Sequence, residues 1–280
     1  MDPEAYRADS RERWEAAAAG WARDREEMQR DSMEVSRWML DAAALQPGHT
    51  VLELAAGPGD TGLMAAELVA PGGRAIITDG AEAMVEAARA RAAEVGASNV
   101  EVRPMEVEWI DLPTASVDAV LCRWGYMLLA DPEAALRETR RVLRPGGRVA
   151  LAAWAGGEHN PWVTLIREVV QKLGLGEPPA PGTPEPLAFG APGRIEELLD
   201  AAGFDDPELD TIDLAFREPS LDAWWEHSVR TSGWTIRLVA GLSPAEHYAL
   251  RDAFDEAYAP YVTDEGVAVP ARALVAAASA

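Results

Sequence analysis

The chain has 280 residues, of which 48% are hydrophobic and 26% are charged, a balance that fits a folded protein and excludes a disordered one. Acidic residues number 47 and basic residues 25, so the net charge at pH 7 is -22. A surface this negative repels phosphate backbones and anionic lipid headgroups. Nucleic-acid and membrane partners are therefore not expected.

The single cysteine, Cys122, excludes an internal disulfide and a metal site built on several cysteines, and no metal site is predicted. No stretch approaches the roughly 18 uninterrupted apolar residues that a membrane-spanning helix requires. The N-terminus is acidic and polar, unlike a signal peptide. We therefore expect a cytoplasmic protein, and a homodimer is an assembly that the sequence allows.

The first part of the chain predicts helices. Residues 2–45 carry apolar side chains at helical spacing, and Pro47 and Gly48 then end the helical pattern. We expect residues 1–46 to form an N-terminal helical cap segment.

From residue 50 onward, short apolar strands alternate with helices. The expected strands are 50–54, 74–78, 100–103, 117–122 and 148–154, and the expected helices are 61–69, 82–95 and 133–143. This alternation predicts βαβ units with a parallel sheet, and right-handed crossovers place helices on both of its faces. Residues 47–155 are expected to form this core.

After Trp154 the pattern changes. We expect a post-core region at 156–219, a helical cap insert at 220–265 that is rich in aromatic residues, and a last strand within 266–280. The post-core region includes a helix at 161–173, a loop rich in proline and glycine at 176–186, a helix at 194–202 and a sixth strand at 209–217. The predicted fold is α/β, a doubly wound, seven-stranded, mostly parallel sheet of the Rossmann-like kind with a helical cap.

The strongest local signal is the run VLELAAGPGDTG at 51–62, in which an apolar strand leads into a glycine-rich turn and a helix. Gly57, Gly59 and Gly62 match the pattern G-x-G-x-x-G, and Asp79 follows about 20 residues later at the end of the second strand. This pattern leaves open an NAD-dependent oxidoreductase and a turn without a ligand.

Two further carboxylates favour a different ligand. Glu53 directly precedes the glycine turn, where a negative charge disfavours a pyrophosphate and suits a cationic amine. Glu106 can accept a hydrogen bond from an exocyclic amino group, while the backbone N–H of Val107 can donate to an adenine nitrogen. Together with Asp79, these groups suit a ligand that has an amine, a ribose diol and adenine but no phosphate. S-adenosylmethionine is such a ligand.

The chain resembles the class I S-adenosylmethionine-dependent methyltransferases and is similar to the ubiquinone/menaquinone-biosynthesis-like group that modifies small molecules. Besides the run at 51–62, the matching motifs are ITDGAEAM (77–84), EVEWIDLP (106–113), VDAVLCRWGYMLL (117–129) and LRPGGRVALAAW (143–154). The resemblance is strong over residues 45–155 and extends more weakly through LLDAAGF (198–204).

The resemblance implies which residues bind the cofactor. Glu53 takes the position of the family's first-strand acid, and Ala55 stands where the family commonly has glycine. Gly57 and Gly59 line the methionine part, and Asp79 binds the ribose hydroxyls. Gly80 and Met84 lie near the adenine, Glu106 and Val107 hold its edge, and Cys122 and Arg123 lie near the methionine moiety and the sulfonium.

The methyl acceptor is expected beyond the carboxyl ends of the strands. The predicted acceptor-binding residues are Tyr6, Trp14, Trp21, Asn160, Trp162, Trp224 and Trp225. An aromatic-lined pocket suits a medium-sized, partly apolar acceptor, although tryptophans at helical spacing also pack into protein cores. His159 and His227 are the candidates for moving a proton during catalysis.

The predicted function is S-adenosylmethionine-dependent methyl transfer to an oxygen, nitrogen or carbon of a small metabolite. Two alternatives remain at this point. The chain could be an NAD-dependent oxidoreductase, or it could bind S-adenosylmethionine without catalysing a reaction.

Overall fold

The computed structural model describes residues 2–177 and 183–280, so part of the expected loop at 176–186 lies outside the described residues. The described strands are β1 (Thr50–Glu53), β2 (Arg74–Asp79), β3 (Val100–Pro104), β4 (Val117–Arg123), β5 (Leu143–Trp154), β6 (Asp205–Glu218), β7 (Val262–Thr263) and β8 (Gly266–Ser279). The described helices are α1 (Pro3–Arg23), α2 (Arg25–Ala42), α3 (Asp60–Leu68), α4 (Glu82–Glu94), α5 (Pro132–Val142), α6 (Pro161–Lys172), α7 (Arg194–Ala201), α8 (Leu221–Thr231), α9 (Gly233–Ala240) and α10 (Pro244–Tyr258).

One sheet organises the chain, with the strand order β3-β2-β1-β4-β5-β8-β6 and β7 paired with β8. Neighbours from β3 to β5 are parallel, whereas β8 is antiparallel to both β5 and β6. The doubly wound, mostly parallel sheet predicted from the sequence is thereby confirmed. The difference is the two-residue β7, which raises the expected seven strands to eight within the described residues.

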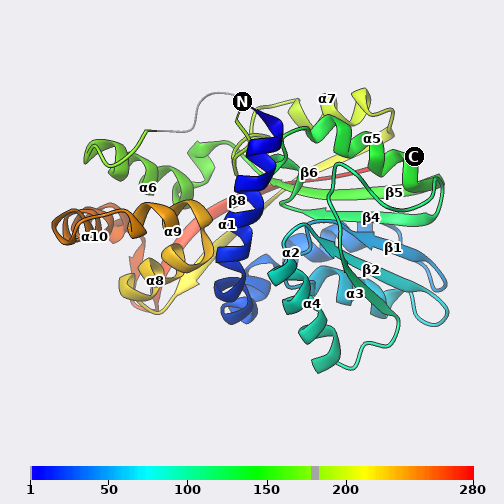
Figure 1. The fold of residues 1–280 in the computed structure, drawn as a ribbon, viewed down its shortest axis with the longest axis horizontal. Helices are drawn as coiled ribbons and strands as arrows, with labels where there is room; N and C mark the ends of the chain where they lie inside the picture. The colour runs from blue at the N-terminus through cyan, green and yellow to red at the C-terminus, as the bar shows by residue number, and fades with distance from the viewer. Residues whose placement is uncertain (1, 178–182) are drawn as a thin grey trace.

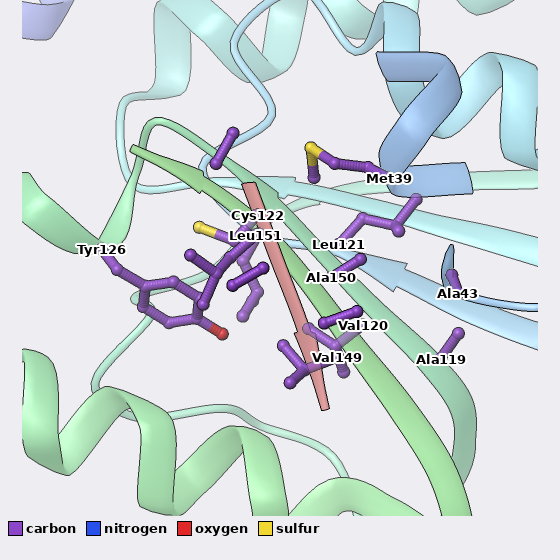
Figure 2. Close-up of a cluster of buried hydrophobic side chains, with 14 of the residues drawn as sticks. Met39, Ala43, Ala119, Val120, Leu121, Cys122, Tyr126, Val149, Ala150 and Leu151 are labelled. Atoms are coloured by element: carbon purple, nitrogen blue, oxygen red, sulfur yellow. The ribbon is translucent and has the colours of Figure 1, made fainter. Parts of the chain in front are cut away.

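The central strands are apolar because both faces of the sheet are covered, as in other parallel sheets. Figure 2 shows Met39 of α2 beside Leu121 and Ala43 beside Ala119, whereas the ring of Tyr126 lies on the opposite side of these strands. Alternate residues of β4 therefore contact different layers, and helix α2 forms part of the sheet's covering.

Several predicted boundaries shift in the structure. Strand β5 begins at Leu143 because Leu143 pairs with Val117, which extends the strand toward the preceding helix. The predicted helical region after residue 220 is divided into α8, α9 and α10, and each begins at a serine whose hydroxyl accepts from the backbone. At Ser243 the predicted capping box with Glu246 is present.

Strands β6 and β8 continue past the end of β5 and carry the cap. β5 pairs with β8 only as far as Ala273, whereas β6 pairs with β8 out to Val267. This extension supports a second hydrophobic cluster formed with α6, α8 and α10, whose buried members are Ile166, Val169, Val170, Trp224, Trp225, Leu250, Phe254, Tyr258, Val267 and Val269. In Figure 1 these helices gather at one end of the molecule, away from β1, β2 and β3. The cap thus has its own core.

Helix α1 joins the two parts. It crosses the middle of the molecule in Figure 1 and packs against α4 on one side and against α8 and α9 on the other. The approach to α8 is close, because a Cβ at Gly20 would collide with the carbonyl oxygen of Arg230. None of the described helices is both long and apolar enough to cross a membrane.

The close approach at Gly20 generates a stability prediction. Alanine favours a helix interior over glycine by about 1 kcal/mol, but the added Cβ at Gly20 forces α1 away from α8, at an overpacking cost of about 1–3 kcal/mol. We expect Gly20→Ala to lower the free energy of unfolding, measured by denaturant titration. Gly241→Ala is the matched control, since a Cβ there makes only ordinary contacts, at 3.6 Å and beyond. A Gly20→Ala variant more stable than the wild type would contradict the prediction.

Candidate cofactor and acceptor site

The predicted charged residues gather at one edge of the sheet because each ends a parallel strand. Glu53 is the last residue of β1, Asp79 of β2 and Arg123 of β4. These three strands are adjacent in the order β2-β1-β4. The structure therefore brings together the carboxyl-edge residues that the sequence analysis had placed there.

The glycine turn between β1 and α3 uses left-handed backbone conformations. Gly57 has φ 55° and Gly59 has φ 82°, which glycine adopts without steric cost. Ala55 also lies in this region, with φ 49°. This explains locally why glycine suits position 55, and it shows that the chain tolerates alanine there.

The Asp79 carboxylate, at the end of the neighbouring strand β2, fixes the glycine turn by accepting backbone hydrogen bonds. One carboxylate oxygen accepts from the Gly57 N–H at 2.9 Å and the other accepts from the Ala81 N–H at 2.9 Å. Burial raises the pKa of Asp79, although these backbone donors act in the opposite direction. The carboxylate that is expected to meet the ribose is thus fixed by the loop itself, and the ribose contact stays a prediction.

Glu53 lies beneath the turn, with 3% of its surface exposed. Its Oε2 accepts from the Gly62 N–H at 2.9 Å, and a Cβ at Gly62 would collide with this oxygen. Burial raises the pKa of Glu53 to about 8, and the charge of Arg123 only partly offsets this. The third glycine of the pattern is therefore explained by its contact with Glu53.

The residues expected near adenine also lie together. A Cβ built at Gly80 would be 3.4 Å from Glu106 Oε2, so this glycine allows the carboxylate to approach. Met84 is buried with Ala81 and packs against Trp14 and Trp21 of α1. Val107 is 5% exposed and belongs to the main core.

Helix α1 is fastened over this side of the sheet by polar contacts. The Glu15 carboxylate accepts from the backbone N–H groups of Glu82 at 2.6 Å and Ala83 at 3.0 Å, and so caps α4. Arg11 pairs with Glu106, and Arg7 pairs with Glu108. The sequence analysis missed Glu15. A signal existed, because Ala81 at the start of α4 supplies no capping side chain.

Two aromatic residues of α1, Tyr6 and Trp21, attach the helix to the segment after β4 and to α8. The Tyr6 hydroxyl donates to the Leu128 carbonyl at 2.9 Å, just after β4. The Trp21 indole N–H donates to the Thr231 carbonyl of α8 at 2.8 Å. A Cβ at Gly57 would lie 3.8 Å from the Trp21 ring, so Trp21 also borders the glycine turn. Tyr6 and Trp21 are thus engaged in attaching α1.

The last two residues of β4, Cys122 and Arg123, make different contacts. Cys122 is fully buried, and burial raises the pKa of its thiol to about 12, so the thiol is not a nucleophile at neutral pH. Its expected contact with the cofactor therefore concerns the backbone. The Arg123 guanidinium donates to the hydroxyls of Ser32 and Ser36 on α2.

A group of stacked aromatic rings follows the ends of β4 and β5. Trp124 stacks on Trp154 with ring centroids 4.4 Å apart, and Trp154 meets Trp162 and Phe216 edge-on. Trp124 has a left-handed φ of 62°, and its buried indole N–H has no hydrogen-bond partner among the described residues. The sequence analysis missed Trp124, although it directly follows Arg123 in the motif at 117–129.

The structure accounts for three other predicted acceptor residues by packing. Trp224 and Trp225 are 2% and 6% exposed and belong to the cap cluster. Asn160 is fully buried; its amide donates to the Ala155 carbonyl at 2.9 Å, and its oxygen accepts from the Arg272 N–H at 3.1 Å. These contacts support a structural role, and a role in acceptor binding stays a prediction.

The two histidine candidates lie in different clusters. His159 is half exposed beside Arg272, at the rim of a cavity of about 800 Å³ between the β5–α6 loop, α6 and β8. His227 is buried on α8, with Nδ1 3.2 Å from Glu218 and 3.5 Å from Asp24 at the α1–α2 junction. Burial lowers the pKa of His227, but these carboxylates more than offset it, and the net direction is upward. His227 therefore connects three segments of the chain.

Comparisons with known proteins agree with this geometry. The profile of the methyltransferase domain family matches residues 54–151. The nocamycin O-methyltransferase of Saccharothrix syringae is 32% identical over 70% of this chain and 75% of its own length. The chain belongs to the S-adenosylmethionine-dependent methyltransferases. A ubiquinone/menaquinone biosynthesis C-methyltransferase of Hahella chejuensis is 33% identical over 48% of this chain, a match that spans 53% of that relative.

Solved structures share the fold of this methyltransferase. A Bacillus halodurans protein proposed to be a methyltransferase has a TM-score of 0.60 at 19% identity, covering 87% of this chain and 97% of its own. A phosphoethanolamine N-methyltransferase of Haemonchus contortus in complex with S-adenosylmethionine has a TM-score of 0.55 at 17% identity, covering 88% and 52%. S-adenosylmethionine is the cofactor of this enzyme, and the dinucleotide interpretation of the glycine pattern is set aside.

The raised pKa of Glu53 predicts how stability depends on pH. Between its ordinary value of 4.5 and about 8, the folded methyltransferase holds a proton that the unfolded chain has lost. The free energy of unfolding therefore falls as pH rises through this window. Glu53→Gln keeps an acceptor for Gly62 and should flatten the profile, measured by denaturant titration across the window. Glu67→Gln, at an exposed position of α3, is the control. Parallel profiles for the wild type and Glu53→Gln would show that Glu53 ionises normally.

His227 predicts a second pH dependence. Because its pKa is raised above 6.5 in the folded state, its contribution to stability is complete below that value and is lost as pH rises through the higher folded value. His227→Gln should be destabilised relative to the wild type most strongly at acidic pH, with the difference shrinking as pH rises. The same substitution at His49 serves as the control, and unfolding free energies provide the measurement. A difference that grows with pH would contradict the assignment.

Proposed function

We propose that this methyltransferase methylates an oxygen atom of a small metabolite whose hydroxyl is acidic, such as an enol, a phenol or a carboxylic acid. The observation that carries the proposal is Trp124, whose buried indole N–H lacks a partner at the carboxyl end of β4. A similar relative is named an O-methyltransferase, and its match extends over more of the chain than the cofactor-binding core.

The cofactor, when bound, supplies an activated methyl group on a sulfonium. We assign the ribose hydroxyls to the oxygens of Asp79 and the adenine edge to Glu106 and Val107, with Gly80 and Met84 beside the ring. These residues fit the group, because carboxylates accept from hydroxyl and amino donors, and Gly80 leaves room next to Glu106. The remaining task of the protein is alignment and exclusion of water.

The acceptor side is aromatic. Trp124 lies between the Trp154 ring and the Arg123 guanidinium, which is 4.9 Å from its centroid, so the orientation of the indole is fixed from both faces. On the side toward the cap, the Trp154 ring contacts the rings of Trp162 and Phe216 edge-on. We propose that the free indole N–H donates to the acceptor oxygen, and that a partly apolar acceptor lies along these rings.

We infer an acidic acceptor because both candidate histidines contact other charged side chains and neither is assigned as a general base. His227 faces Asp24 and Glu218, and His159 faces Arg272 and Glu158. His227 stacks on Trp224, which lies beside Phe216, but its Nδ1 faces Asp24 and Glu218, so we assign the proton to neither histidine. An acceptor that arrives as an anion needs no general base, because the oxygen attacks the methyl carbon directly.

The proposal is tested with a panel of acceptors. The enzyme is incubated with S-adenosylmethionine labelled in its methyl group together with phenols, enols, carboxylic acids, aliphatic alcohols and amines, and products are identified by mass spectrometry. We expect label only on the oxygens of the acidic acceptors, with a rate that follows each acceptor's own pKa. Label confined to nitrogen, carbon or aliphatic hydroxyls would overturn the proposal.

Trp124→Phe separates the indole donor from the ring. Loss of a hydrogen bond to a charged acceptor costs about 1.5–3 kcal/mol, so kcat/KM for the acceptor should fall by roughly tenfold or more. Affinity for S-adenosylhomocysteine, measured by calorimetry, should stay unchanged. Trp225→Phe, within the cap core, is the matched control. An equal loss of cofactor and acceptor affinity in Trp124→Phe would remove the indole from the acceptor site.

A further inference from the structure

A row of three rings leads from the proposed acceptor site to His227. Phe216 of β6 meets Trp154 and Trp162 edge-on and is partly exposed, so it can contact an acceptor that lies along these rings. Trp224 of α8 stacks on Phe216 with ring centroids 6.1 Å apart and is only 2% exposed. The His227 imidazole stacks on Trp224 in turn, at 5.6 Å and an interplanar angle of 11°. The orientation of Phe216 is therefore linked to His227 through packed rings.

His227 lies between two carboxylates that belong to different parts of the chain. Its Nδ1 is 3.2 Å from Glu218 Oε1, at the end of β6, and 3.5 Å from Asp24 Oδ2, at the α1–α2 junction. No more than 14% of any of these three side chains is exposed. Charges that are largely buried are screened little by salt and solvent. A protonated His227 therefore attaches α8 both to the end of β6 and to the α1–α2 junction.

The two carboxylates depend on His227 to different degrees. The other charged side chains around them are Arg23, Arg30, Asp31, Glu226 and Arg230. Asp24 also pairs with Arg230 at 2.8 Å, whereas His227 is the one cation within 4.0 Å of Glu218 among the described residues. Burial lowers the pKa of His227, but the carboxylates more than offset this and the net shift is upward. Loss of the imidazole proton leaves Glu218 without a close counter-charge, which is costly for a mostly buried carboxylate.

We propose that protonated His227 is a positioning residue for the acceptor: through Trp224 it fixes Phe216 along the acceptor site, and loss of its proton weakens acceptor binding. The inference rests on the proposed function, because it takes Phe216 and the rings beside it as the acceptor's surroundings. His227 transfers no proton in this role, since its Nδ1 faces Glu218 and Asp24 and its ring contacts Trp224. The enzyme therefore binds its acceptor more tightly when His227 is charged.

The experiment follows the acceptor KM with pH at saturating S-adenosylmethionine. The acceptor is one that receives label in the panel and does not itself titrate near neutral pH. In the wild type the KM should rise by roughly threefold to tenfold as pH increases through the folded pKa of His227, and NMR titration of the imidazole measures that pKa independently.

Three variants identify the titrating group. Glu218→Gln removes a carboxylate that raises the pKa of His227, so the midpoint of the KM profile should move to lower pH. His227→Gln should give a high KM that no longer depends on pH. Glu226→Gln is the matched control for Glu218→Gln, because Glu226 lies on the same helix as His227 but is exposed and pairs with Arg230 instead. Its midpoint should equal that of the wild type.

Two outcomes would overturn the positioning role, whether or not His227→Gln folds. One is a wild-type acceptor KM that stays flat across the His227 titration. The other is a uniformly raised KM in Glu218→Gln with an unmoved midpoint, since that result indicates a structural role alone. The cofactor KM, recorded over the same pH range, separates the titration of Glu53, whose pKa is raised to about 8. The oxygen assignment of the proposed function stands or fails on the acceptor panel, because the pH profile can be recorded with any acceptor that receives label.

Discussion

The site depends on carboxylates that hold the glycine turn by accepting from backbone N–H groups. Asp79 accepts from Gly57 and Ala81, and Glu53 accepts from Gly62. Backbone amides at a turn are otherwise free to point in several directions, and fixing them costs conformational entropy. Because parallel strands end at one edge, β1 and β2 deliver both carboxylates to the same turn, and the geometry of the cofactor site follows from this pairing.

Helix α1 depends on this arrangement and extends it. Its Glu15 carboxylate caps α4, which begins just after Asp79, and its Trp21 indole reaches the α8 carbonyl of Thr231. The cap has a separate hydrophobic cluster from that of the sheet. Helix α1 therefore joins the two parts by direct contacts, while their hydrophobic cores stay separate.

The alternation of strands and helices, and the acids and glycines at the strand ends, could be predicted from the sequence because they follow local periodicity and turn chemistry. The capping role of Glu15 could not, since it joins α1 to α4 across 67 residues. Ser32 and Ser36 read as ordinary small residues on a helix, and only the approach of Arg123 gives them a role. Trp224 and Trp225 show a different limit, because an aromatic cluster in sequence suits both a ligand site and a core; their burial supports packing in the core, and a role in acceptor binding stays a prediction.

At the carboxyl edge of the sheet, buried acidic side chains are either protonated or paired with a cation. Sulfonium and ammonium groups are positive, and the acids near the turn either stay protonated, as burial favours for Glu53, or are paired, as Asp60 is. A cationic cofactor lowers the cost of ionising Glu53, since an opposite charge nearby stabilises a carboxylate.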